Sequence, residues 1–365
     1  MKKNRVALIL AAVIAAGTLA ACGGSSSASG SASSSASAET PAQSTQSAAP
    51  ANAEYTLICA STYNEEYHYY KAMKMMEEEI EEKSGGRIDV QVYASGSIAA
   101  DDRESLEMLT RNEIQFGMGE NSVIAAVYND PRIGASTIPF FLGDDNEQIY
   151  KLLDEGEAYT SLYKEMDEKY RLHVVCSVST DEAVSINRIR PCASIADFSG
   201  LNIRTDTSDD YAKPMSLIGA NPTTLSWGEV YTSLQQGVID GCFSTKSGMY
   251  SMGFYEICKY CTDLNVFDMM HTYCYASDFY DSLPEDLQKV LDEAGENFKV
   301  NVREMAQEYI DSIPALLEAD GVEVIELDDA FKADLEAAYA PYIEERKNAI
   351  PDFVALVEQD IANLW

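Results

Sequence analysis

Apolar residues recur along this chain with two alternating periods, one typical of strands and one typical of helices. Residues 55–60 (YTLICA) predict a strand. A helix follows, and one of its faces carries the apolar residues Tyr67, Tyr70, Met73, Met76 and Ile80. Strand-like alternation returns at 87–93 (RIDVQVY) and at 114–118, on either side of a short helix over 101–110. This rhythm predicts an α/β fold with a largely parallel sheet.

The same alternation continues through the second half of the chain. A helix over 146–169 leads to a strand over 172–178 (LHVVCSV). In the stretch 227–241 (WGEVYTSLQQGVIDG), Gly237 is expected to end a helix and Val238 to begin a buried strand. Residues from 284 onward are mostly helical in pattern, with one strand expected at 322–325.

The N-terminal part has a different composition. Residues 1–22 begin with lysines and an arginine and continue with an apolar run of roughly a dozen residues, the pattern of a secretory signal peptide. The run is shorter than the about 20 apolar residues that a membrane span needs. It ends in Leu-Ala-Ala-Cys at Cys22, which resembles a bacterial lipobox, so that Cys22 would receive the lipid; in an ordinary signal peptide this cysteine has no role. Residues 23–53 are rich in Ser and Ala and predict a flexible tether.

Charge and cysteine content narrow the choice of partners. The chain has 26 basic and 60 acidic residues, which disfavours nucleic acids and anionic membrane surfaces as partners. An anionic small molecule stays compatible, because one desolvated arginine can dominate a pocket. Without Cys22, an odd number of cysteines remains, which argues against a full disulfide framework. Cys258 and Cys261 lie at helical spacing and favour a buried helix, with a metal site or a disulfide as the alternative.

No catalytic motif stands out in the sequence. There is no Gly-x-Ser-x-Gly elbow, no Walker A loop and no His-Glu-x-x-His, and the three histidines His68, His173 and His271 are not at metal-binding spacing. The sequence therefore suggests no reaction, no metal and no cofactor. A binding protein rather than an enzyme is the interpretation that remains.

A succession of short motifs then points to a known family. Residues 188–241 contain, in order, Arg-Pro, Asp-x-x-Gly-Leu-x-Ile-Arg, Gly-Ala-x-Pro and Glu-Val-Tyr-x-x-Leu-Gln-x-Gly-x-x-Asp-Gly. This order and spacing resemble the extracytoplasmic solute receptors of tripartite ATP-independent periplasmic (TRAP) transporters. Residues 81–120 are similar to the first domain of that family, and residues 279–296 to its late helix.

The resemblance implies a two-lobed, periplasmic-binding-protein-like α/β fold that closes on its solute. Lobe I would comprise residues 54–180 plus about 266–305, and lobe II residues 181–265 plus about 306–365, with crossings near 178–182 and 265–271. The implied function is capture of a small organic acid by a monomeric, lipid-anchored receptor outside the cytoplasm, and its delivery to TRAP membrane permease subunits. The alternatives are a ligand-sensing lipoprotein of the same fold and an exported hydrolase.

The resemblance also implies a set of site residues. Arg204 ends a predicted strand, where ligands bind in open α/β sheets, and its planar fork would pair with the carboxylate of the solute. The alternative for Arg204 is an interdomain salt bridge. Trp227 would pack on the ligand, or else belong to the core. Glu120 and Asp102 would make polar contacts, or else lie on a solvated face. From the other lobe, His68 or Asn64 at the start of the first helix would reach the ligand.

Two positions depart from the pattern of that family. Where many members have a second arginine, this chain has Val184, and where many have a carboxylate-binding asparagine, it has Ser244. Arg188 or Arg190 would have to compensate for the first loss. The two departures argue against a dicarboxylate or a sialic acid and favour a monocarboxylate with an apolar or aromatic body. The walls for such a body would come from the aromatic residues Tyr63, Tyr67, Phe243 and Trp227.

Overall fold

The computed structural model of the chain describes residues 52–143 and 145–365. The predicted signal peptide, the lipidation candidate Cys22 and almost all of the tether lie outside the described residues. In the described part, none of the helices combines the length and the apolar character that crossing a membrane requires.

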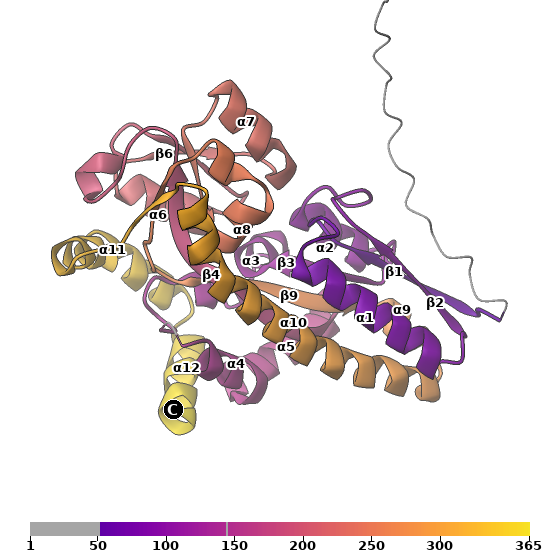
Figure 1. Ribbon diagram of the computed structural model, residues 1–365. Helices are drawn as coiled ribbons and strands as arrows, with labels where there is room; N and C mark the ends of the chain where they lie inside the picture. Colours follow the sequence, from indigo (N-terminus) through magenta and orange to yellow (C-terminus); the bar gives the residue numbers. More distant parts are fainter. Residues whose placement is uncertain (1–51, 144) are drawn as a thin grey trace, which may run out of the picture. The chain divides into compact units, whose positions relative to one another are not determined.

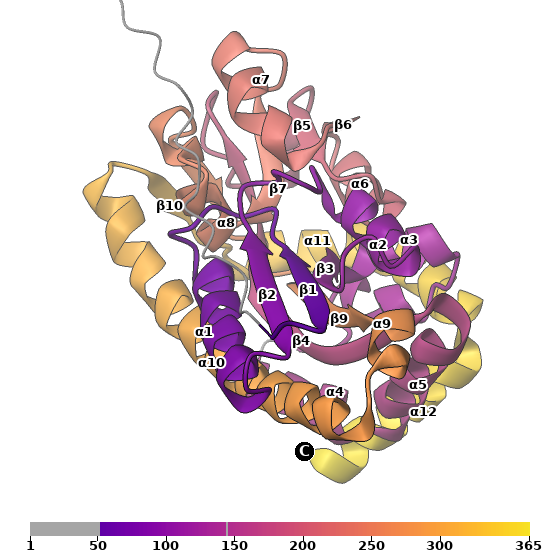
Figure 2. The same ribbon diagram turned by 90° about the vertical axis from the view of Figure 1, so that its right-hand side faces the viewer.

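The described residues build one mixed sheet with helices on its faces (Figures 1 and 2). Its strands follow the order β2-β1-β3-β9-β4-β7-β5-β6, and β8 pairs with β4 and β10. The strands are β1 (Tyr55–Ala60), β2 (Ile88–Tyr93), β3 (Phe116–Glu120), β4 (Leu172–Asn187), β5 (Asn202–Thr205), β6 (Asn221–Thr224), β7 (Gly241–Thr245), β8 (Tyr260–Thr262), β9 (Asp268–Ala276) and β10 (Glu323–Ile325). The helices in the first half are α1 (His68–Lys83), α2 (Asp102–Thr110), α3 (Asn121–Tyr128), α4 (Asn146–Glu155) and α5 (Glu157–Tyr170). Those in the second half are α6 (Asp209–Leu217), α7 (Val230–Gln236), α8 (Lys246–Ser251), α9 (Ser277–Ser282), α10 (Glu285–Ala319), α11 (Asp329–Ala349) and α12 (Pro351–Leu364).

The α/β class is confirmed, but the sheet is parallel only towards its two edges. β1 pairs in parallel with β2 and β3, and β5 pairs in parallel with β6 and β7. In the middle, β9 pairs antiparallel with both β3 and β4, and β4 pairs antiparallel with β7. The expectation of a largely parallel sheet is therefore wrong for the centre, where two long strands return without a crossover helix.

β4 joins the two halves of the sheet. Its first part, from Leu172 to Ser179, pairs with β9, and its last part, from Ala183 to Asn187, pairs with β7 and β8. The register shifts between these parts, where Asp181 has a φ of 105°, a backbone conformation that few non-glycine residues adopt. The sequence pattern predicted a strand that ends at 178, whereas the structure continues it through this irregularity to Asn187.

α10 also contacts both halves. This 35-residue helix packs along α1 and β4 and reaches α8 at its other end (Figure 1). Its apolar residues up to Ala306 belong to a core around β1, β3 and β9, whereas Ile313 and Leu317 belong to a core that includes β7, α7 and α8. A third cluster lies around β5, α6 and α11. The C-terminal α12 packs on α4 and α5, and its apolar residues belong to the first of these cores.

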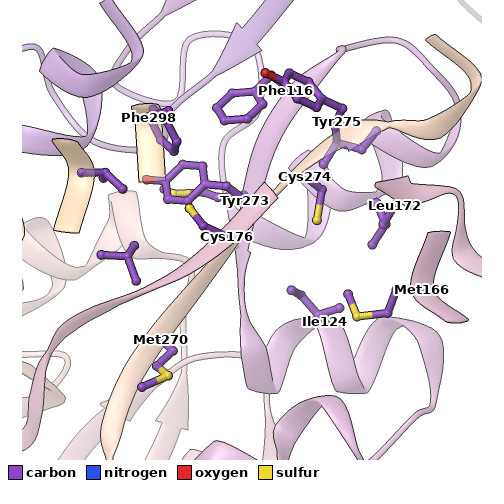
Figure 3. Close-up of a cluster of buried hydrophobic side chains, with 14 of the residues drawn as sticks. Phe116, Ile124, Met166, Leu172, Cys176, Met270, Tyr273, Cys274, Tyr275 and Phe298 are labelled. Atoms are coloured by element: carbon purple, nitrogen blue, oxygen red, sulfur yellow. The ribbon is translucent and has the colours of Figure 1, made fainter. Parts of the chain in front are cut away.

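In the first core, aromatic side chains from β3, β9 and α10 meet among aliphatic and sulfur-containing side chains (Figure 3). Phe116 on β3 lies 5.7 Å from Tyr273 on β9 and 5.2 Å from Phe298 on α10, measured between ring centroids. The rings of Tyr273 and Phe298 also meet edge to face. Offset and edge-to-face contacts of this kind add to the stabilisation that the buried area provides.

Three local expectations need correction. The predicted helix 146–169 is two helices, because Gly156 is extended and the carboxylate of Asp360 accepts a hydrogen bond from the amide of Ala158 at 2.8 Å. Cys258 and Cys261 are buried and free, as a core position requires, but Cys261 lies in the strand β8 and neither is in a helix. Val238 is 57 % exposed in the turn after α7, so the buried strand begins only at Gly241.

Candidate functional site

A cavity opens at the carboxyl ends of β3, β5 and β7, where the loops of both sheet halves meet. It encloses an empty volume of about 710 Å³, part of which is open to solvent. Six of the predicted site residues line it, namely Arg204, Trp227, Glu120, Asp102, Ser244 and Phe243. These residues are far apart in the sequence, but their strands lie in one sheet. In that sheet, β9, β4 and β7 lie between β3 and β5.

The other two predicted residues, His68 and Asn64, are not among the lining residues of this cavity. His68 is buried between the rings of Tyr67 and Tyr309, and this burial lowers its pKa to about 3, so that the imidazole is neutral. The side chain of Asn64 accepts hydrogen bonds from the amides of Glu66 and Tyr67 and donates one to the carbonyl of Ser251. Asn64 thus stabilises the turn that precedes α1.

Arg204 is the buried cation of the cavity, with 6 % of its surface exposed. Arg204 lies near the carboxyl end of β5, and its Nε donates a hydrogen bond to the carbonyl of Leu225 at 2.9 Å. Its guanidinium carbon lies 5.2 Å from the ring centre of Trp227, a cation–π contact that holds the fork in one orientation. In the described part of the chain, no carboxylate forms an ion pair with Arg204, whereas Arg132, Arg171 and Arg303 each have one. The guanidinium is therefore desolvated and has no carboxylate in direct contact, although Asp206 interacts with its charge from a longer distance.

Carboxyl groups gather opposite this arginine. Glu120 at the end of β3 is 5 % exposed, and its Oε2 accepts hydrogen bonds from the amide of Ser122 at 2.8 Å and from the hydroxyl of the same residue. Asp206 follows Arg204 by two residues and accepts a hydrogen bond from the amide of Ser208 at 2.7 Å. Burial raises the pKa of Glu120 to about 8 and that of Asp206 to about 7. Because like charges repel, Asp206 raises the pKa of Glu120 further, and Asp102 and Asp210 raise that of Asp206.

Asp102 and His271 form a separate contact on the wall of the cavity. The Asp102 Oδ2 accepts a hydrogen bond from the amide of Glu120 at 2.9 Å and lies 3.4 Å from the His271 Nε2. α2 positions Asp102 at its first turn, where the helix end favours a carboxylate. The Nδ1 of His271 is buried without a hydrogen-bond partner in the described residues, which leaves it available to a ligand.

The two departures from the family pattern are neighbours in the structure. Val184 on β4 lies directly opposite Ser244 on β7 in the antiparallel register. Val184 is fully buried and belongs to a hydrophobic core, whereas Ser244 lines the cavity. At this pair of positions, the chain thus has a valine and a serine where the family resemblance would lead us to expect an arginine and an asparagine.

Sequence reasoning missed many of the residues that line the cavity, and three of these matter most for its chemistry. Asp206 and Tyr211 line it from the segment after β5, and His271 lines it from β9. Asp206 could have been found, because residues two apart on a strand share a face and Arg204 had already been placed at the strand end. His271 carried no such signal, since β9 was not anticipated as a central strand.

One glycine lets β7 approach β4 closely enough to present Phe243 and Ser244 to the cavity. A Cβ on Gly241 would lie 2.0 Å from the carbonyl oxygen of Ile186. We expect Gly241→Ala to lower the free energy of unfolding by about 1–3 kcal/mol or more, because backbone cannot move aside as a side-chain tip can. Gly228→Ala is the matched control, because a Cβ there meets no atom within 4 Å. Urea unfolding of both variants checks this, and equal losses in the two would contradict the steric explanation.

Comparison with known proteins places the chain in a family. The sequence profile of the bacterial extracellular solute-binding proteins, family 7, matches residues 59–348. The chain belongs to this family. It is 25 % identical over 289 residues to a solute-binding protein of Chromohalobacter salexigens, covering 79 % of this chain and 83 % of the relative. It is 27 % identical over 265 residues to the ectoine-binding periplasmic protein TeaA of Halomonas elongata, covering 70 % and 74 %.

Solved structures of the family share the fold. The sugar-acid-binding protein of Advenella mimigardefordensis, in complex with galactonate, superimposes with a TM-score of 0.79 at 18 % identity, covering 85 % of this chain and 98 % of that one. A TRAP periplasmic solute-binding protein of Chromohalobacter salexigens with bound D-glucuronate gives a TM-score of 0.77 at 23 % identity, covering 85 % and 100 %. The chain is thus a bacterial extracellular solute-binding protein of family 7, and it shares the two-lobed α/β fold of these solved proteins, as its sequence predicted.

The family consists of transport proteins that bind a solute, and the cavity has the features of a binding site. Within residues 52–143 and 145–365, no group of His, Cys, Asp and Glu side chains is arranged to hold a metal ion. A buried arginine without a counter-ion, an aromatic wall and buried carboxyls can recognise a ligand by charge, shape and hydrogen bonds.

Proposed function

We propose that this family 7 receptor captures a small organic acid by pairing its carboxylate with Arg204, and delivers it to the membrane subunits of a TRAP transporter. The observation that carries the proposal is the desolvated guanidinium at the cavity, which has no carboxylate partner in the described residues. A buried cation without a counter-ion is costly unless a ligand supplies the opposite charge. Two parallel N–H···O bonds to a carboxylate would provide this charge and fix the orientation of the ligand.

We further propose that the solute has one carboxylate. The position expected for a second arginine holds Val184, which is buried in a hydrophobic core beside Ser244. Arg188 does not replace it, because its guanidinium interacts with the carboxylate of Asp240 away from the cavity. Arg190 donates to the carbonyls of Asp197 and Ser199, also outside the cavity lining. Galactonate and D-glucuronate, bound in the two solved neighbours, each carry a single carboxylate as well.

The arrangement of the receptor follows from the same fold. Lobe I would comprise residues 54–180 and about 266–305 together with α12, and lobe II the segment 181–265 with the residues from about 306 up to α12. The irregular part of β4 at Asp181 would act as one hinge, because its register shift separates the two pairings of this strand. Residues 1–22 would direct export, and a lipid on Cys22 would keep the receptor at the membrane surface.

A thermal-shift screen of residues 54–365 tests the proposal. The panel would hold monocarboxylates, dicarboxylates, keto acids, aromatic acids, sugar acids and sulfonates. A ligand present at about 100 times its dissociation constant should raise the free energy of unfolding by roughly 2.7 kcal/mol. We expect shifts with monocarboxylates and smaller shifts with dicarboxylates of the same length. If neutral amides of the same acids shift the protein as strongly as the acids do, the carboxylate proposal is wrong.

A further inference from the structure

The lining of the cavity includes two chemically different sets of groups. The first set is hydrogen-bond donors, namely the guanidinium of Arg204 and the indole Nε1 of Trp227, which is buried without a partner in the described residues. The second set is the carboxyl groups of Glu120 and Asp206, which we call the carboxyl pair, with the hydroxyl of Tyr211. A ligand that contacts both sets must carry an acceptor and a donor.

The hydrogen bonding of Glu120 Oε1 points to a ligand at the carboxyl pair. Glu120 lines the cavity although it is only 5 % exposed, and its Oε2 accepts hydrogen bonds from the amide and the hydroxyl of Ser122. Its Oε1 and the buried hydroxyl of Tyr211 have no hydrogen-bond partner in the described part of the chain other than each other. A carboxylate oxygen can accept two hydrogen bonds, so Oε1 can still accept one from a bound molecule.

Charge then decides what kind of donor fits. Two partly buried carboxyl groups near this place have basic neighbours, since Asp102 lies beside His271 and Asp210 forms an ion pair with Arg346. Neither member of the carboxyl pair forms an ion pair with a described residue, although Arg204 attracts Asp206 from a longer distance. A neutral hydroxyl could form hydrogen bonds here without stabilising the ionised pair, whereas an ammonium group donates hydrogen bonds and also stabilises the ionised carboxylates.

We infer that the solute is amphoteric, with a carboxylate held by Arg204 and a protonated amine held between Glu120 and Asp206. This inference rests on the proposed function and makes its substrate class more specific, because a receptor for amino acids or related amphoteric compounds differs from one for plain organic acids. Glu120 and Asp206 come from opposite sides of the cleft, one after β3 and the other after β5. The amine would therefore contact both lobes, so binding of this group would favour closure of the lobes around the solute.

The dependence of affinity on pH separates an amphoteric ligand from a plain acid. Burial keeps protons on the carboxyl pair in the empty site, among the neighbouring groups Arg204, Asp102, Asp210 and Tyr211. An ammonium group favours the ionised pair, so binding releases protons and tightens as the pH rises. A plain carboxylate adds a negative charge to the same cavity, so its binding takes up protons and weakens as the pH rises.

Isothermal titration calorimetry with two matched series tests the inference. The first series is 4-aminobutyrate, 4-hydroxybutyrate and butyrate, and the second is phenylalanine, phenyllactate and 3-phenylpropionate. In at least one series we expect the amine to bind about tenfold or more tighter than its two matched partners, as one charge-assisted bond implies. Between about pH 6 and about pH 8.5, the affinity of this amine should rise, and titrations in buffers of different ionisation enthalpy should show proton release.

Variants of the carboxyl pair complete the test. Glu120→Gln and Asp206→Asn should each remove the preference for the amine while the plain acid of that series binds as well as before or better. Plain acids that bind as tightly as the amines, and more weakly at high pH, would overturn the inference and leave the proposed function standing. Failure of all six compounds, in a receptor shown to be folded by its unfolding transition, would count against both.

Discussion

Arg204→Ala is expected to weaken binding of the acid identified in the screen by at least about 100-fold. Arg204 would supply two charge-assisted hydrogen bonds, each worth roughly 1.5–3 kcal/mol, and 1.4 kcal/mol corresponds to a tenfold change in affinity. The loss should be large because the cavity offers no nearby substitute. Arg103 also lines it, but Arg103 is less buried than Arg204 and lies in the first turn of α2 beside Asp101 and Asp102. Calorimetric titration of the wild type and the variant measures the effect.

Two further variants test whether the loss of affinity comes from the guanidinium of Arg204 itself. Arg204→Lys keeps the charge but not the planar fork, so we expect it to recover part of the lost affinity and not all of it. Arg111→Ala removes an arginine at the exposed end of α2 that is engaged with Glu107 and Glu113, and it should bind the acid as the wild type does. A folded Arg204→Ala protein that binds the acid with unchanged affinity would refute the role given to this residue.

The parts of the site that sequence reasoning found share one property. Arg204, Ser244 and Glu120 each lie at or near the end of a strand, and in an open α/β sheet strand ends meet at one edge whatever the details of the topology. Their approximate place could therefore be inferred before the strand order was known. Their hydrogen-bond partners and burial could not, because these depend on which strands lie next to each other.

The expectations that did not hold depended on contacts between distant segments. His68 begins α1 as anticipated, but the chain turns its ring towards Tyr67 and Tyr309, and Tyr309 lies on α10. The helix 146–169 breaks at Gly156, since Asp360 of α12 caps the second piece. β4 extends beyond residue 178 because β7 and β8 offer it new partners there. Local periodicity carries no information on any of these neighbours.

The buried position of Glu120 lowers the stability of the ligand-free receptor, because burial disfavours the ionised carboxylate. A buried carboxyl whose pKa in the folded protein is raised holds its proton after the unfolded chain has lost it. Between its ordinary pKa of 4.5 and the raised value of about 8, the folded state therefore binds more protons than the unfolded state, and the free energy of unfolding falls as the pH rises. Below this window the group costs nothing, and above it the full penalty for burying a charge applies.

Glu120→Gln should accordingly stabilise the ligand-free receptor at about pH 8 by roughly 4 kcal/mol, and by less than about 1 kcal/mol near pH 5. The amide has the same shape and its oxygen can accept the two hydrogen bonds from Ser122 that the carboxylate accepts, so the substitution removes the charge with little repacking. Urea unfolding at both pH values measures the difference. The matched control is Glu336→Gln on the exposed side of α11, which should leave stability nearly unchanged at both.

A variant that gains stability and loses the preference for an amine would show that one carboxyl group serves recognition at the expense of the empty fold. This combination is expected wherever a binding site keeps a desolvated charge ready for its ligand, because the ligand provides the compensation that the protein lacks. Equal stability of Glu120→Gln and the wild type at about pH 8 would instead mean that Glu120 is already compensated in the empty receptor. In that case the amine would have no uncompensated charge to neutralise, and the preference for amphoteric solutes should be absent as well.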